Sequence, residues 1–169
     1  LVGSEMCIRD RVTFTFEECD VVPLCQRVLA SVSQARKSEN EFIFECDRES
    51  MDMRTDTQRL QQVIINLLSN ADKFTRNGKI TLGLKVDEKQ REVLFSVSDT
   101  GTGIPLEKQK LVFERFEKLN EYVQGTGLGL SICKLTVEKW GGEIWVDPGY
   151  TDGARFVFTH PLDIEQPKK

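Results

Sequence analysis

Four short motifs in the middle of the chain carry residue types that could together hold a nucleotide and its phosphates. They span residues 66–75, 99–104, 113–116 and 125–130. The first is rich in side-chain amides, the second pairs a carboxylate with glycines, the third is aromatic and charged, and the fourth is glycine-rich. Each pattern alone is weak. In this order they predict a site for a purine nucleotide with metal-bound phosphates.

The first motif lies on a segment with helical periodicity that Asp56 can cap and that extends to about residue 74. Asn66, Asn70 and Lys73 share one face at the roughly 100° rotation per residue of a helix, away from its apolar side chains. Such a stripe can be a solvated surface. The functional interpretation is that the Asn70 carbonyl oxygen ligates Mg²⁺, which prefers oxygen, while Lys73 neutralises phosphate charge.

The second motif begins at Asp99, which ends an apolar strand-like run and precedes Gly101 and Gly103. Asp and Gly are common where a strand enters a turn, so an ordinary turn is one interpretation. The other is that the Asp99 carboxylate accepts a hydrogen bond from an exocyclic amine, a contact of about 1.5–3 kcal/mol in a dry pocket. The glycines would then let the backbone approach a purine ring.

The fourth motif places Gly125, Gly127 and Gly129 at the start of a helix predicted over residues 128–140. Backbone N–H groups at such an entrance can cradle phosphates. The motif lacks the lysine of a P-loop, and Leu130 stands where a dinucleotide fingerprint would have its third glycine. A glycine-rich hinge is the alternative interpretation.

The third motif, between the two glycine-containing ones, has two phenylalanines in a polar stretch. Phe113 and Phe116 could form a minor core cluster. They could also anchor a lid that folds over bound nucleotide, with Arg115 reaching the terminal phosphate.

The segments around these motifs mix strand and helix patterns without a regular βαβ rhythm. We therefore expect an α+β fold with one mixed sheet and helices packed on one face. Strands are predicted at 13–16, 41–46, 79–86, 92–98, 143–146 and 154–159, helices after Asp20 to about 35, after Asp56 to about 74 and over 128–140, and a short helix with loop over 105–119.

Composition limits the classes of function. The net charge of −4 and the lack of a basic tract predict no nucleic-acid partner, and no apolar run is long enough to span a bilayer, so we expect no direct membrane contact. Five cysteines without CxxC spacing and a single histidine, His160, do not predict a zinc site. Reduced thiols fit a cytoplasmic compartment, with Cys25 and Cys133 in the core.

Length and composition predict one domain over residues 12–162. Residues 1–11 follow neither alternation nor helical spacing and lack the parts of a signal peptide. We expect a disordered leader of unclear origin, either a foreign or mistranslated segment or the end of a truncated gene. Residues 163–169 are expected to form a C-terminal tail.

The ordered set of motifs resembles the N, G1, F and G2 boxes of the catalytic ATP-binding domain of bacterial sensor histidine kinases, a branch of the GHKL superfamily that includes gyrase, Hsp90 and MutL. The resemblance covers residues 13–162. It implies a two-layer α/β sandwich of the Bergerat type, in which a mixed five-stranded sheet backs about three helices. It also implies a mobile ATP lid and the cofactors ATP and Mg²⁺.

The same resemblance implies roles for individual residues. Asn70 matches the Mg²⁺ ligand, and Asp99 matches the carboxylate that reads adenine. The residues implied in catalysis are Asn66, Lys73 and Arg115. Those implied in nucleotide binding are Asn70, Lys73, Phe74, Asp99, Gly101, Gly103, Ile104, Phe113, Phe116, Gly125, Thr126, Gly127, Leu128, Gly129 and Leu130.

Histidine kinases transfer the γ-phosphoryl group to a histidine on an upstream dimerisation domain and then to a response regulator receiver domain. The residues before Asn66 are used by the ATP-binding domain itself, and His160 ends the last strand, so we expect an acceptor elsewhere and a monomer in isolation. Alternatives are a GHKL-type ATPase, an anti-sigma serine kinase and a non-catalytic nucleotide-binding module. The ATPases place a catalytic glutamate where this chain has Asn66, and an amide cannot take a proton from water.

Overall fold

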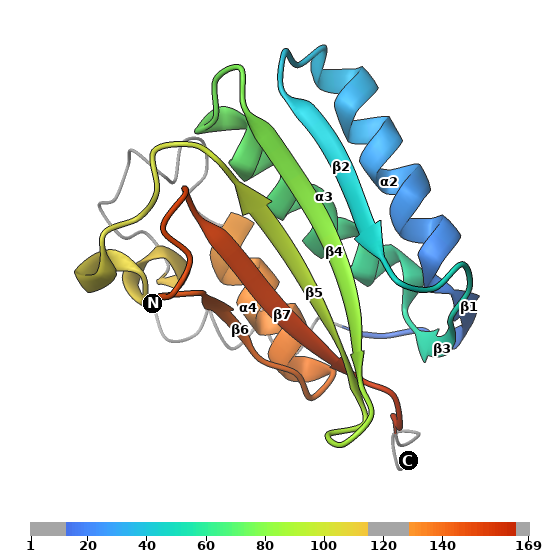
Figure 1. Cartoon of the computed structure of the whole chain (residues 1–169). Helices are drawn as coiled ribbons and strands as arrows, with labels where there is room; N and C mark the ends of the chain where they lie inside the picture. The colour runs from blue at the N-terminus through green and yellow to red at the C-terminus, as the bar shows by residue number, and fades with distance from the viewer. Residues whose placement is uncertain (1–12, 115–128, 165–169) are drawn as a thin grey trace.

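Alternating apolar and polar residues build the central sheet of the computed structural model, which describes residues 13–114 and 129–164 (Figure 1). The described elements are β1 (Glu17–Asp20), α2 (Val21–Arg36), β2 (Glu41–Cys46), β3 (Asp52–Thr55), α3 (Thr57–Lys73), β4 (Lys79–Asp87), β5 (Glu92–Asp99), the short 3₁₀ turns η1 (Leu106–Lys108) and η2 (Leu111–Phe113), α4 (Gly129–Lys139), β6 (Ile144–Val146) and β7 (Arg155–Pro161).

Five strands form one mixed sheet in the order β2-β4-β5-β7-β6. The β2–β4 pair is parallel, and the three other pairs are antiparallel. Figure 1 shows α2, α3 and α4 together behind this sheet, which leaves its other face without helices. The predicted α+β architecture, with a mixed five-stranded sheet and three helices on one face, is therefore confirmed.

The core lies between the sheet and the three helices. The apolar face of α3 carries Leu60, Ile64, Leu67 and Leu68, all fully buried, and each such side chain contributes about 1.5–3 kcal/mol to stability. Phe95 of β5 and Phe158 of β7 stack with ring centroids 4.7 Å apart. The face of α3 that packs here is opposite its amide stripe, so burial of the core turns the amides away from the sheet.

Local signals set the ends of the two long helices as predicted. The Asp20 carboxylate accepts a hydrogen bond from Val22 N at 3.2 Å and caps α2. The Asp56 carboxylate accepts one from Arg59 N at 3.1 Å and caps α3. The helix that carries the first motif therefore begins and ends close to the predicted residues.

The strand predicted at residues 13–16 is wrong. The segment that pairs is β1, which joins β3 in a separate two-stranded antiparallel sheet. Phe14 instead packs near Trp140, with ring centroids 6.3 Å apart. β3 was not predicted, because two of its four residues are charged and its partner strand lies far away in the sequence.

Within the part of the chain that the structure describes, no helix combines the length and apolar character needed to cross a bilayer.

Candidate nucleotide-binding site

Asp99 stands at the end of β5 with 4% of its surface exposed. Its Oδ1 accepts hydrogen bonds from Gly101 N at 2.9 Å and from Ala154 N at 3.1 Å. Its Oδ2 makes no hydrogen bond to any described residue. Burial raises the pKa of this carboxyl, and the two backbone N–H groups only partly offset that effect. Asp99 is thus a buried carboxylate that is held through Oδ1 and leaves Oδ2 as an available acceptor.

The turn after Asp99 requires its glycines. A Cβ on Gly101 would lie 2.0 Å from the carbonyl oxygen of Phe74, and Gly103 has a φ of +72° and faces Gly153. Ile104 closes the turn as a buried side chain. Because glycine has no Cβ, the backbone of this turn can approach neighbouring groups such as the Phe74 carbonyl more closely than any other residue would allow.

The end of α3 meets this turn directly, which joins the first two motifs. Phe74 caps α3, and its carbonyl oxygen accepts a hydrogen bond from Thr102 N at 3.2 Å. Asn66 and Asn70 are half-buried on the amide stripe, and Lys73 is exposed. The structure therefore brings the end of α3, which carries Asn70, Lys73 and Phe74, next to the turn that follows Asp99.

The amide of Asn66 contacts α4, since its Nδ2 donates to Cys133 Sγ at 3.6 Å. Cys133 is buried, as predicted, and burial raises the pKa of its thiol to about 12, so the sulfur stays protonated. The side chain of Asn70 makes no hydrogen bond with another described residue. Of the two amides, Asn70 is the one available to a ligand.

The lid and phosphate motifs are described only at their ends. Phe113 is buried and packs edge-on against Phe156, with ring centroids 5.9 Å apart. Gly129 opens α4, and Leu130 is buried. Arg115, Phe116, Gly125, Thr126, Gly127 and Leu128 lie outside the described residues, so their assigned roles stay predictions.

A polar network behind α3 was not foreseen from the sequence. Asp72 lies inside the first motif, but its carboxylate accepts hydrogen bonds from Arg36, Ser38 and Asn40. Asn40 also donates to Thr75 O at 2.9 Å and accepts from Gly78 N at 2.9 Å. Burial raises the pKa of Asp72, but these donors outweigh it and hold the pKa below its usual value. The network fixes the segment that follows Lys73.

A second segment that contacts Asp99 was also not predicted from the sequence. It is the loop between β6 and β7, where Gly153 packs on Asp99 and the Tyr150 hydroxyl donates to Asp99 O at 2.9 Å. The one available signal was a glycine directly before the last predicted strand. Sequence alone does not indicate which strand end such a glycine faces.

His160 is unsuited to accept a phosphoryl group in this fold. The ring is fully buried and lies beside Trp140, with ring centroids 4.7 Å apart. Its Nε2 is 2.9 Å from Thr55 Oγ1, and its Nδ1 is 2.8 Å from Pro161 O. Both ring nitrogens therefore have partners inside the core.

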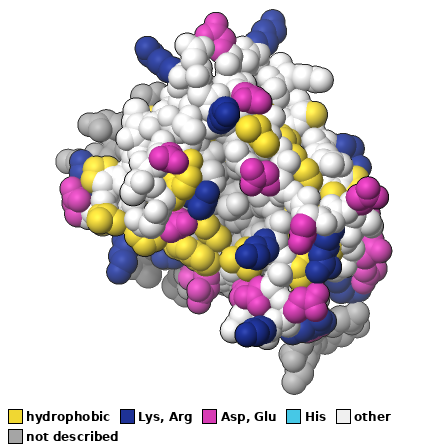
Figure 2. Space-filling view, in the orientation of Figure 1, with side chains coloured by type: hydrophobic (Ala, Val, Ile, Leu, Met, Phe, Trp, Pro, Cys, Tyr) yellow, Lys and Arg dark blue, Asp and Glu magenta, His cyan; other side chains and the backbone are white. Residues whose placement is uncertain are grey.

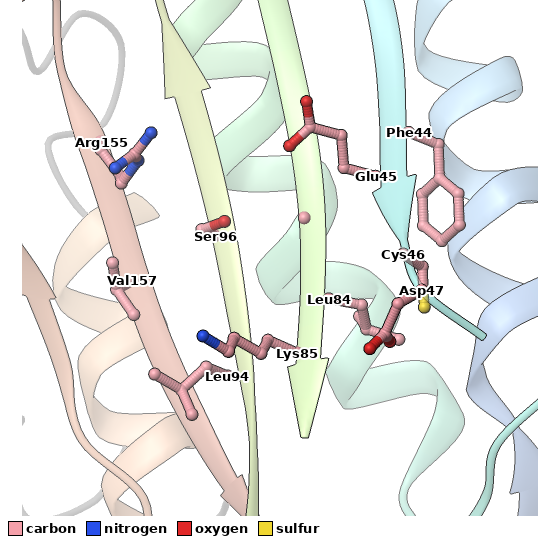
Figure 3. A pocket seen from close by; sticks show the side chains of 11 residues that line it. Phe44, Glu45, Cys46, Asp47, Leu84, Lys85, Leu94, Ser96, Arg155 and Val157 are labelled. Carbon is pink, nitrogen blue, oxygen red and sulfur yellow. The ribbon is translucent and has the colours of Figure 1, made fainter. Parts of the chain in front are cut away.

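The face of the sheet opposite α2, α3 and α4 has a hollow of ≈ 730 Å³ lined by residues of β2, β4, β5 and β7 (Figure 3). Acidic and basic side chains are interspersed over this face (Figure 2). None of the motif residues that the structure describes lines the hollow. The hollow is therefore separate from the candidate nucleotide site at the ends of α3 and β5.

Comparison with known families agrees with this geometry. A family model described as histidine kinase-, DNA gyrase B-, and HSP90-like ATPase matches residues 55–164. The chain belongs to this family. The match runs from the end of β3 through all four motifs to β7, so the resemblance drawn from the motifs is confirmed.

Similar proteins place the chain among the histidine kinases of the family. The adaptive-response sensory kinase SasA of Microcystis aeruginosa is 38% identical over 144 residues, which is 82% of this chain and 37% of SasA. The chain thus spans about 37% of the length of that relative.

Solved structures agree in fold. The catalytic domain of histidine kinase ThkA matches with a TM-score of 0.79 and 35% identity over 88% of this chain and 97% of that domain. ThkA in complex with response regulator protein TrrA matches with a TM-score of 0.76 and 30% identity, over 96% of this chain and 46% of that chain. Full-length ShkA in complex with AMPPNP matches with a TM-score of 0.82 and 26% identity, over 97% of this chain and 36% of that chain.

Proposed function

We propose that this chain binds Mg-ATP and donates its γ-phosphoryl group to a histidine as the catalytic domain of a sensor histidine kinase. The observation that carries the proposal is the Asp99 carboxylate, which is buried, fixed through Oδ1 and available at Oδ2. Such a group accepts a hydrogen bond from the amine of adenine and offers none to the carbonyl of guanine. The bond is worth about 1.5–3 kcal/mol.

Mg²⁺ fits the residues at the end of α3. Asn70 offers a hard amide oxygen from a half-buried side chain. This side chain makes no hydrogen bond to another residue that the structure describes. Mg²⁺ takes one or two protein oxygens, and phosphates and waters complete its shell. The described residues accordingly include no group of three or more His, Cys, Asp or Glu side chains that could hold a metal. When bound, the ion would neutralise charge on the phosphates.

Transfer of the phosphoryl group depends on positioning and on charge neutralisation, with little covalent work for the protein. We assign neutralisation to Lys73, to Arg115 and to the backbone N–H groups of residues 125–129. Asn66 occupies the place of the water-activating glutamate of the related ATPases, and an amide cannot act as that base. This difference favours transfer to a protein side chain over hydrolysis.

The acceptor histidine belongs to another domain in this proposal, because His160 is buried with both ring nitrogens engaged. The partners are then a histidine-bearing dimerisation domain and, after it, a response regulator receiver domain. The similarity to ThkA, whose structure is known in complex with response regulator protein TrrA, supports a response regulator as one partner. We assign the chain to the cytoplasm and expect it to be monomeric when isolated.

The test is phosphoryl transfer in trans. The chain is mixed with Mg²⁺, γ-labelled ATP and a separately produced dimerisation domain of the parent kinase. Acid-labile label should appear on the histidine of the acceptor and not on the chain. An acceptor without its histidine is the control.

Three results would contradict the proposal or a part of it. If ATP does not bind, the site is not a nucleotide site. If free phosphate is released without acceptor as fast as label is transferred with it, the ATPase alternative is correct. Label on the chain itself would contradict the assignment of the acceptor to another domain.

A further inference from the structure

Tyr150 connects the β6–β7 loop to the backbone of Asp99. Its hydroxyl donates to Asp99 O at 2.9 Å, although the two residues lie on different elements. Burial raises the pKa of this phenol, so the hydroxyl keeps its proton at neutral pH and remains a donor. Asp99 N donates to Ala154 O at 2.8 Å in the same region. The loop therefore holds the backbone of Asp99 from both sides.

Arg155 holds Tyr150 in turn. The guanidinium carbon lies 4.2 Å from the centroid of the Tyr150 ring, within the range of a cation–π contact. Arg155 Nε donates to Ser98 Oγ at 2.7 Å, and its Nη1 lies 3.6 Å from Asp147 Oδ2. One planar guanidinium thus ties together the loop, the ring and the strand residue that precedes Asp99.

This arrangement reaches the helix-free face of the sheet. Arg155 projects from β7 at the rim of the hollow there, with Ser96 of β5 on the neighbouring strand (Figure 3). The β6–β7 loop itself is closed by hydrogen bonds, since Tyr150 N donates to Asp147 O at 3.3 Å and Asp147 N to Arg155 O at 2.8 Å. The loop behaves as one unit whose position sets that of Tyr150.

We propose that Tyr150 and Arg155 are positioning residues that fix the Asp99 carboxylate for recognition of the purine amine. The inference rests on the proposed function of Asp99 and adds two residues outside the four motifs. Neither residue touches the nucleotide in this assignment. Tyr150 acts on the backbone of Asp99, and Arg155 acts through Tyr150 and Ser98.

The physical reason is that a carboxylate discriminates between an amine and a carbonyl only when its free oxygen is held in place. Without the Tyr150 hydroxyl, the loop loses its direct bond to Asp99 O. The Ala154 N–H group on Oδ1 belongs to the same loop, so Oδ2 becomes free to shift as well. Purine selectivity should therefore fall while the fold, which does not depend on this single bond, remains.

The experiment measures binding of ATP and of inosine triphosphate, which has a carbonyl in place of the amine, by calorimetry on the full chain. Tyr150→Phe keeps the ring and removes only the hydroxyl. The ATP preference should fall about two- to tenfold, the effect expected for one neutral hydrogen bond. Arg155→Lys, which keeps the charge but loses the planar contact, should lower the preference in the same direction. Thr151→Ala, exposed in the same loop, should leave it unchanged.

A double-mutant cycle tests whether the effect passes through Asp99. In an Asp99→Asn background, Tyr150→Phe should cause no further loss of preference, because the group it positions is gone. An additive loss would overturn the proposal and place Tyr150 in direct contact with the nucleotide. An unchanged preference in both Tyr150→Phe and Arg155→Lys would also overturn it. Failure of the parent chain to bind ATP would instead reject the proposed function itself.

Discussion

Gly153 packs so closely on Asp99 that a Cβ at position 153 would lie 2.1 Å from Asp99 O and 2.7 Å from Asp99 Oδ1. No side chain can occupy that space unless the strand end or the loop moves. The glycine is therefore part of the site, although it lies outside every motif that the sequence displays. Because it has no side chain, Gly153 allows the β6–β7 loop to pack directly against Asp99.

Gly153→Ala should weaken ATP binding and lower stability, because overpacking of this kind typically costs about 1–3 kcal/mol. The matched control is Gly149→Ala in the same loop, where the new Cβ would meet Asp147 Oδ1 at an ordinary 3.4 Å. Thermal unfolding and ATP titration of both variants would measure the difference. Equal behaviour of the two variants would mean that the contact at Gly153 is not restrictive.

Asp99→Asn should weaken ATP binding by roughly 10- to 150-fold, the loss expected for one charge-assisted hydrogen bond. The parent chain should also bind GTP poorly. Because burial raises the pKa of Asp99, acidification should protonate it at a higher pH than an ordinary aspartate, and ATP affinity should fall there. The Asn variant should lack that step. Equal affinity of the parent for ATP and GTP would refute this role of Asp99.

The elements that carry the site follow from local signals, which is why the sequence predicts them well. Asp56 caps α3, and β4 and β5 alternate apolar and polar residues on either side of a polar turn. These patterns involve residues within a few positions of one another. They were enough to predict the helix that carries Asn70 and the strand that leads to Asp99.

The residues that support the site could not be predicted, because their partners are distant in the sequence. The orientation of the Asp72 side chain depends on hydrogen bonds from Arg36 and Asn40, which lie where α2 leads into β2. Tyr150 reaches Asp99 only because β5 and β7 are neighbours in the sheet. Strand order depends on the whole core and has no signature in a short window.

Asn70→Ala should lower ATP affinity mainly when Mg²⁺ is present, because the group removed is a metal ligand in our assignment. Binding of ADP in chelator should change little. Calorimetry with and without the metal would separate the two contributions. Asn66→Ala is the comparison variant on the same helix, because it removes an amide that already donates a hydrogen bond to Cys133. An equal loss with and without metal would show that Asn70 has a structural role instead.

His160 should make the fold sensitive to mild acid. Burial lowers the pKa of its ring from 6.5 to about 4, and the hydrogen bond to Pro161 O only partly offsets this. Above pH 6.5 the ring is neutral in the folded and unfolded chains, so it has no effect on the pH dependence. Between 6.5 and about 4 the unfolded chain binds more protons, so stability falls as the pH falls.

The expected loss over that window is on the order of 3 kcal/mol, from the size of the pKa difference. His160→Gln can still pair with Thr55 and Pro161 but does not titrate, so its stability should change less between pH 6.5 and 4. Urea unfolding at several pH values would measure the difference between the two proteins. Carboxylates with lowered pKa values, such as Asp72, titrate in both proteins and cancel in that difference. Parallel pH profiles for the parent and the variant would mean that His160 does not control acid stability.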